Sequence, residues 1–182
     1  MVNFTIFAGG YTSFIASYLF DSEARSLTLL NQSLTGPSPS WITLHRTNSS
    51  ILYAVNEVSS GALQSFTINS NGSLAGPVDQ VSSGGDGPAY AGALSTGQVA
   101  ILNYGSGNGK FITTISDSLH FAKNSSLITF PPPDGGVSHP HMALEHAAEV
   151  FVSDLVSFIT VLTDIIRAQC CYDSFIHNSG CG

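Results

Sequence analysis

Short apolar runs that end in a polar residue recur along the chain. Three of them are "LYAVNE" (52–57), "AILNYG" (100–105) and "VFVSDL" (150–155), so they return with a period of about fifty residues. Continuous apolar runs of this length are typical of strands that are buried on both faces. The pattern predicts an all-β chain that is built from repeated units.

A proline precedes each apolar run by about a dozen residues. The three prolines are Pro39 in "PSW", Pro88 in "GPAY" and Pro140 in "HPHM". Residues 18–30 and 64–77 each read as two short strands around a polar turn, and the second holds an Asn-Gly pair that favours a hairpin. We expect each unit to run, in chain order, from an outer hairpin to a proline-marked strand and then to the apolar strand.

A period of this length with about four short strands is typical of a β-propeller blade. A β-sandwich has similar strand spacing and is the alternative. The repeated order of proline, apolar run and terminal Asn or Asp favours the propeller. The chain has room for about three four-stranded blades, whereas closed propellers have about four to eight. We therefore predict a partial β-propeller over residues 1–155 with open sheet edges.

Composition, charge and cysteine positions limit which partners and which cellular compartment we expect for the protein. Charged residues make up 9% of the 182 residues and the net charge is −7, which argues against nucleic acid or an anionic membrane surface as partner. The start, "MVNFTIFAGGYT", reads as a strand and not as a signal peptide. All three cysteines lie in the last thirteen residues, so the main body has no disulfide framework. These features predict a cytoplasmic protein.

The last segment, residues 156–182, has a different character. Apolar residues at helical spacing predict an amphipathic helix over about 156–171, followed by a disordered end. This helix would be too short and too charged to span a bilayer.

The stretch "GGVSHPHMALEH" (135–146) concentrates histidines. His139 and His141 stand two residues apart, so in an extended segment both rings point to one side. This spacing suits an acid–base pair, or two ligands of a metal ion that would need at least one more ligand. The plainer alternative is that the two imidazoles cap a strand and pack against the next blade. This copy of the proline-marked strand carries imidazoles where the other copies carry Trp41 and Tyr90.

Polar residues at the ends of the apolar runs form a second candidate group. If all these strands run the same way, Glu57, Asn103 and Tyr104 line one mouth of a central channel. A carboxylate there can act as a base, and Asn or Tyr can hold a carbonyl oxygen. The alternative is that the asparagines fix turns at the strand ends. The Gly-rich "NYGSGNGK" (103–110) lacks the spacing of a phosphate-binding loop and predicts a hairpin turn instead.

Taken together, these elements resemble the lactonase family of seven-bladed β-propellers, which includes 6-phosphogluconolactonases and carboxy-cis,cis-muconate cyclases. The resemblance rests on the three apolar runs and on "GGYTSFIASYLFD" (9–21), "GPSPSW" (36–41), "SGGDGPAY" (83–90), "NYGSGNGKF" (103–111) and "HPHMALEH" (139–146). It implies an intracellular enzyme that acts on a lactone, or on a muconate that closes to one, without a cofactor. Because the family's chains are about twice as long, we expect a truncated member.

The resemblance favours His141 as a residue of the active cleft. We predict that His141 and Glu57 carry the chemistry and that His139, Asn103, Tyr104 and Trp41 contact the substrate. Three functions stay open: a lactonase-family enzyme, an inactive fragment that binds proteins or itself through its open edges, and a small metal-dependent hydrolase. Only four cations fall within the repeats, which makes an anionic substrate harder to hold.

Overall fold

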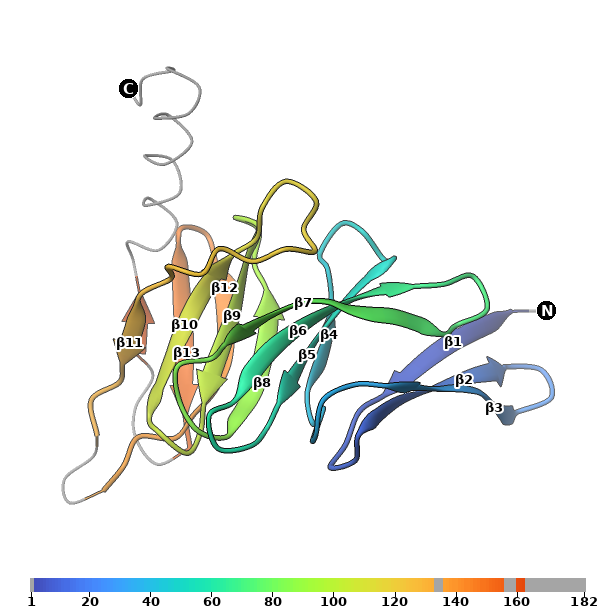
Figure 1. Ribbon diagram of the computed structural model, residues 1–182, viewed down its shortest axis with the longest axis horizontal. Coiled ribbons are helices and arrows are strands. Elements are labelled where there is room, and N and C mark those ends of the chain that lie inside the picture. Colours follow the sequence, from blue (N-terminus) through green and yellow to red (C-terminus); the bar gives the residue numbers. More distant parts are fainter. Residues whose placement is uncertain (1, 133–135, 156–159, 163–182) are drawn as a thin grey trace.

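The computed structural model describes residues 2–132, 136–155 and 160–162, which form four antiparallel sheets (Figure 1). Sheet 1 contains β1 (Asn3–Ala8), β2 (Phe14–Asp21) and β3 (Ser26–Leu34). Sheet 2 contains β4 (Ile42–Leu44), β5 (Ile51–Asn56), β6 (Ala62–Ile68) and β7 (Leu74–Ser82). Sheet 3 contains β8 (Pro88–Ala93), β9 (Gln98–Asn103), β10 (Asn108–Thr113) and β11 (Leu127–Thr129). Sheet 4 contains β12 (Pro140–His146), β13 (Glu149–Asp154) and β14 (Thr160–Leu162).

The sheets stack face to face, and an apolar cluster fills each space between neighbours. Ile15 of sheet 1 packs against Leu52 and Phe66 of sheet 2. Further clusters join sheet 2 to sheet 3 and sheet 3 to sheet 4. Figure 1 shows the succession from sheet 1, in blue at the right, through sheets 2 and 3 toward the left. This arrangement of short antiparallel sheets is that of a partial β-propeller, which confirms the predicted fold class.

Strands β5 and β9 are the predicted apolar runs. Every residue of both strands is buried, because each strand lies second in its four-stranded sheet and is covered on both faces by neighbouring sheets. Tyr53 and Ile101, one from each strand, belong to the same cluster between sheets 2 and 3. Burial on both faces explains why these segments are continuously apolar instead of alternating.

The predicted order of strands within each repeated unit is wrong. We expected a hairpin to precede the proline-marked strand of its own unit, but in sheets 2 and 3 the proline-marked strand comes first, the apolar strand second and the hairpin last. Residues 18–30 therefore lie in sheet 1 with β1. In the described residues, two four-stranded sheets are flanked by two three-stranded ones, and sheet 1 has no strand equivalent to β4. Sequence spacing fixes the period of a repeat but not where each unit begins.

Two predicted turns are confirmed. The Asn71-Gly72 pair lies in the connection between β6 and β7, and Gly72 has a φ of 79°, in the region that glycine adopts most readily. The Gly-rich segment forms the hairpin between β9 and β10.

The predicted C-terminal helix is wrong at residues 160–162. These residues form β14, which pairs with β13 and extends sheet 4, so the hydrogen bonds of an existing sheet edge override the helical spacing of the apolar residues. The rest of the predicted helix and the predicted disordered end lie outside the described residues. The boundary at Leu155 stays a prediction.

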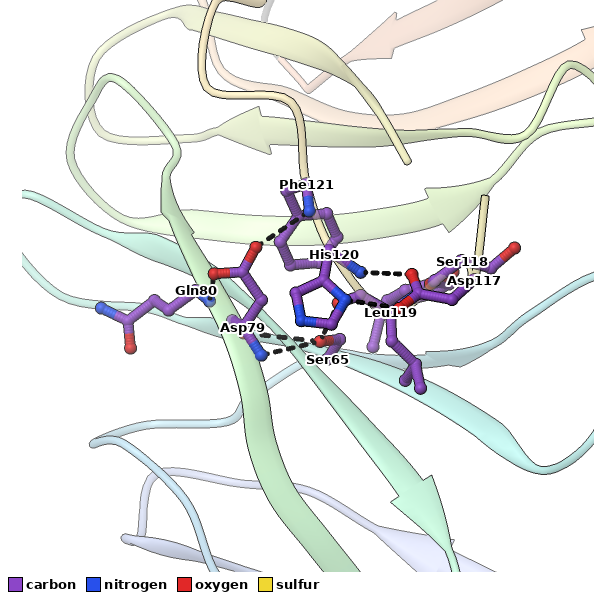
Figure 2. Close-up of polar contacts among 9 residues, drawn as sticks. Ser65, Asp79, Gln80, Asp117, Ser118, Leu119, His120 and Phe121 are labelled. Carbon is purple, nitrogen blue, oxygen red and sulfur yellow. Dashed lines mark hydrogen bonds and ion pairs between the residues drawn. The ribbon is translucent and has the colours of Figure 1, made fainter. Parts of the chain in front are cut away.

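The connection between β10 and β11 is fixed onto the outer strands of sheet 2 (Figure 2). The Ser65 hydroxyl donates to the Leu119 carbonyl oxygen at 2.6 Å, and the Phe121 N–H donates to a carboxylate oxygen of Asp79 at 2.9 Å. The Lys123 ammonium group lies 3.1 Å from the other Asp79 carboxylate oxygen. Asp79 therefore links sheet 3 to sheet 2 beside their shared apolar cluster, to which the Phe121 side chain belongs.

We expect Asp79→Asn to lower the free energy of unfolding by about 1–3 kcal/mol at pH 7, because it weakens charge-assisted hydrogen bonds to a side chain that is only 17% exposed. Burial alone would raise the pKa of Asp79. The Phe121 N–H, the Lys123 ammonium group and the Gln80 N–H stabilise the carboxylate, however, and hold its pKa below the usual value. The measurement is denaturant-induced unfolding of the wild type and the variant between pH 2 and pH 7.

The lowered pKa sets the direction of the pH effect. A carboxyl whose pKa falls on folding adds stability above its unfolded pKa of about 3.9, and this stability is lost as the pH falls through the folded-state pKa. Lys123→Met is the matched control, because it removes the exposed ion pair and keeps the Phe121 bond. We expect a cost below about 1 kcal/mol for this control. Equal stability of Asp79→Asn and wild type at pH 7 would contradict the assignment.

Candidate active site

The innermost strands β4, β8 and β12 hold the first set of site residues. Each of these strands pairs with the apolar strand of its own sheet, and three of the residue pairs occupy the same place in their sheets: Ile42–Ala54, Ala91–Ile101 and Ala143–Val152. The marked proline of each strand lies the same number of residues before the first member of its pair, so the three prolines are equivalent. The residues that directly follow them are Ser40, Ala89 and His141. The register therefore confirms that these strands are copies of one element.

The same register places the His141 imidazole one residue before the position of Trp41 and Tyr90. The prediction that this copy carries imidazoles in the place of Trp41 and Tyr90 is wrong, because the pairing puts Met142 in that place. The pairing of β8 and of β12 shifts directly after the proline, at Ala89 and at His141. Such a bulge redirects one side chain out of the regular alternation of the strand. The bulge itself depends on pairing across the sheet, which proline spacing does not show.

The second set of site residues follows the next strand of each sheet. Glu57 comes directly after β5, Tyr104 after β9 and Leu155 after β13, and Tyr11 follows β1 by three residues. Because these strands run in the same direction, their ends meet on one side of the sheets. This is the shared mouth that the sequence predicted for Glu57 and Tyr104.

Both sets line one open cleft of about 420 Å³, a volume within the usual range for small-molecule sites. Its lining residues are Tyr11, Ser40, Trp41, Glu57, Ala89, Tyr104, His141 and Leu155. All four sheets contribute to the lining. The structure thus brings together four of the six predicted site residues, and the remaining two, His139 and Asn103, lie outside the lining.

His141 stands between two aromatic rings of the cleft. Its ring lies edge-on to Trp41, with centroids 6.2 Å apart, and edge-on to Tyr104, with centroids 6.0 Å apart. Trp41 is held in turn by Tyr90 of sheet 3, at 5.1 Å between ring centroids. The His141 side chain is only partly buried. An imidazole in this position is oriented by its neighbours and still reaches solvent in the cleft.

His139 supports Tyr104 from outside the cleft lining. The two rings stack with centroids 4.2 Å apart and an interplanar angle of 19°. The His139 Nδ1 atom lies 2.7 Å from the Tyr104 carbonyl oxygen. Because a carbonyl oxygen only accepts, Nδ1 carries the proton of this hydrogen bond. The two histidines therefore both contact the Tyr104 ring, but only His141 also lines the cleft.

Asn103 is fully buried at the end of β9. Its side-chain amide donates to the Ser83 carbonyl oxygen at 3.1 Å and to the Asn108 side chain at 2.7 Å. Asn56, at the equivalent position of β5, donates to the Pro37 carbonyl oxygen at 3.0 Å. These bonds satisfy backbone groups of the loops that surround the strand ends. The geometry matches the alternative in which the asparagines fix turns.

Glu57 supplies the only carboxylate of the cleft lining. The Tyr11 hydroxyl donates to Glu57 Oε1 at 3.3 Å and joins sheet 1 to sheet 2 across the mouth. The negative charge of Glu57 raises the pKa of the Tyr11 hydroxyl, since a second negative charge beside the carboxylate is unfavourable. Tyr11 therefore acts as a hydrogen-bond donor to Glu57.

Sequence reasoning missed Tyr11, Ser40, Ala89 and Leu155. An alignment of the units on their prolines would have placed Ser40 and Ala89 beside His141. An alignment on the strand ends would have placed Leu155 beside Glu57. Within the described ranges, no group of three His, Cys, Asp or Glu side chains is arranged to hold a metal ion.

The family model for the seven-bladed β-propeller lactonases matches residues 5–156. The chain belongs to this lactonase family. The match covers the described strands except β14 and the first two residues of β1, and it includes every lining residue of the cleft. No curated protein matches the chain.

Solved structures of bacterial lactonases are similar to the described fold. A periplasmic gluconolactonase from Pseudomonas aeruginosa has a TM-score of 0.81 at 20% identity, over 92% of this chain and 52% of its own. Two proteins provisionally described as 6-phosphogluconolactonases are also similar. The one from Bacteroides uniformis has a TM-score of 0.78 at 22% identity, over 90% of this chain and 50% of its own. The one from Bacteroides fragilis has a TM-score of 0.77 at 19% identity, over 88% of this chain and 48% of its own.

The chain thus spans about half the length of these lactonase-family structures. In the part of the chain that the structure describes, no helix has the length and apolar character needed to cross a bilayer.

Proposed function

We propose that the cleft binds a small lactone and hydrolyses it. The observation that supports this most strongly is that His141, Glu57 and Tyr104, from three different sheets, line one solvent-accessible cleft beside Trp41. A lactone needs a base for the attacking water, a donor for its carbonyl oxygen and an acid for its leaving oxygen. Imidazole, carboxylate and phenol can supply these roles near neutral pH.

In the proposed reaction, the oxygen of a water molecule bonds to the carbonyl carbon while the His141 imidazole takes a proton from the water. The Tyr104 hydroxyl donates to the carbonyl oxygen as it becomes negative. The ring C–O bond then breaks, and the imidazolium returns its proton to the leaving ring oxygen. The product is an open hydroxy acid, which at neutral pH releases one proton to the solvent.

Glu57 has a supporting role in this proposal. Its Oε1 atom accepts from Tyr11, so the carboxylate is held at the mouth of the cleft. There it can accept a hydrogen bond from the attacking water or from a hydroxyl of the substrate. His139 acts as a positioning residue, because it stacks on Tyr104 and binds its carbonyl oxygen.

The test is ring opening of glucono-1,5-lactone, followed by proton release at pH 7. We expect the wild-type chain to give a rate above spontaneous hydrolysis that saturates with lactone concentration. A heat-denatured sample of the same chain is the control. A wild-type rate equal to the spontaneous one would contradict the proposal. Cyclisation of a carboxymuconate is a weaker candidate, since this substrate is a polyanion and the cleft lining holds no Arg or Lys.

A further inference from the structure

The cleft lining holds one carboxylate and no lysine or arginine. Glu57 is the only Asp, Glu, Lys or Arg among the lining residues, and no lysine or arginine joins it. Bound phosphate groups are usually held by Arg, Lys or several backbone N–H groups. A phosphorylated ligand in this cleft would instead meet the Glu57 carboxylate.

The cations of the described residues are placed elsewhere. Lys123 pairs with Asp79 on the outer edge of sheet 2, at 3.1 Å. Lys110 donates to the Ser82 carbonyl oxygen, also at 3.1 Å. Arg46 pairs with Glu145, which lies at the opposite end of β12 from His141. Arg25 lies in the exposed turn between β2 and β3. The described part of the chain therefore has no lysine or arginine to offer to a phosphate in the cleft.

The remaining lining suits a neutral polyol. Trp41 and Tyr104 present aromatic surface, whose electron-rich faces attract the polarised C–H groups of a sugar ring. The Glu57 carboxylate can accept hydrogen bonds from hydroxyl groups of such a ligand.

We propose that the cleft selects an uncharged polyhydroxy lactone and discriminates against its phosphorylated counterpart. This inference deepens the proposed function, since it rests on lactone binding at the same cleft. It assigns the discrimination to the Glu57 carboxylate and to the absence of lysine and arginine among the lining residues. The net charge of −7 acts in the same direction over a longer range.

Trp41 provides a direct readout, because it is the only tryptophan of the chain. The probes are glucono-1,5-lactam, an unreactive neutral analogue of the lactone, and the same lactam with a phosphate on its sixth carbon. Each is titrated into the wild-type chain while the Trp41 fluorescence is recorded. We expect a saturable change with the neutral lactam and a dissociation constant at least about tenfold higher with the phosphorylated one.

Glu57→Gln tests the cause of the discrimination. This substitution keeps the size of the side chain and removes its charge, so we expect the ratio of the two dissociation constants to narrow several-fold. Asp86→Asn is the matched control, because Asp86 lies outside the cleft lining, and we expect it to leave the ratio unchanged. Equal or tighter binding of the phosphorylated lactam to the wild type would overturn the inference, as would the absence of binding by either probe. Selective lactam binding without any hydrolysis would support the inference and contradict only the proposed function.

Discussion

His141→Ala is expected to lower kcat/KM for lactone hydrolysis by about 10²–10⁴-fold, the usual contribution of a general acid–base group. The expectation follows from the position of the ring, which lines the cleft between Trp41 and Tyr104 and is the only imidazole to do so. The measurement is steady-state proton release at pH 7 with purified wild type and variant. Because His141 packs against two aromatic rings, the fold of the variant is checked by its Trp41 emission and its far-ultraviolet circular dichroism.

His146→Ala is the matched control for this prediction. His146 lies on the same strand as His141 but at its opposite end, exposed and away from the cleft lining. We expect its kcat/KM to stay within about twofold of the wild-type value. A His141→Asn variant keeps a polar side chain of moderate size if the alanine variant folds poorly. Full activity in a folded His141 variant would remove His141 from the proposed mechanism.

A preparation of residues 1–182 alone is expected to self-associate through the outer faces of sheets 1 and 4. On sheet 1, Phe4 and Leu29 lie on the face away from sheet 2 and are 51% and 50% exposed. On sheet 4, Leu144 points away from sheet 3 and is 60% exposed. Contiguous apolar surface of this kind is rare on monomers. We expect a second copy of the chain to cover these two faces.

Substitution of either face tests this expectation. We expect the wild type to sediment as dimers or larger species at micromolar concentration, and Leu29→Lys or Leu144→Lys to shift it to monomer. Val78→Lys is the control, since Val78 is exposed on β7, which belongs to neither face. A monomeric wild type at these concentrations would contradict the prediction.

The fold was predictable from the sequence because burial on both faces leaves a continuous apolar run, as in β5 and β9. The prolines gave the period, and the Asn71-Gly72 pair marked a hairpin. The sequence did not show which strand begins each sheet, because the period of the repeat is the same whichever strand is counted first. At residues 160–162 local spacing indicated a helix, and the available edge of β13 determined a strand instead.

The site residues that directly follow a strand could be predicted from the sequence. Glu57 and Tyr104 follow equivalent strands, so a common direction was enough to bring them to one mouth. Whether Asn103 points inward or toward the cleft depends on the strand's pleat and on nearby backbone groups, which composition does not show. The bulge that directs His141 into the cleft is likewise set by pairing across the sheet. Ser40 and Ala89 escaped notice because small residues carry no chemical signal of their own.

The most direct test of the central claim is the dependence of the ring-opening rate on chain concentration. With glucono-1,5-lactone at pH 7, the account predicts a rate above the spontaneous one that is proportional to wild-type chain concentration and is suppressed by glucono-1,5-lactam. The same series with His141→Ala should lie close to the spontaneous rate. A wild-type rate that does not change with chain concentration would contradict the assignment of this cleft as a lactone-hydrolysing site.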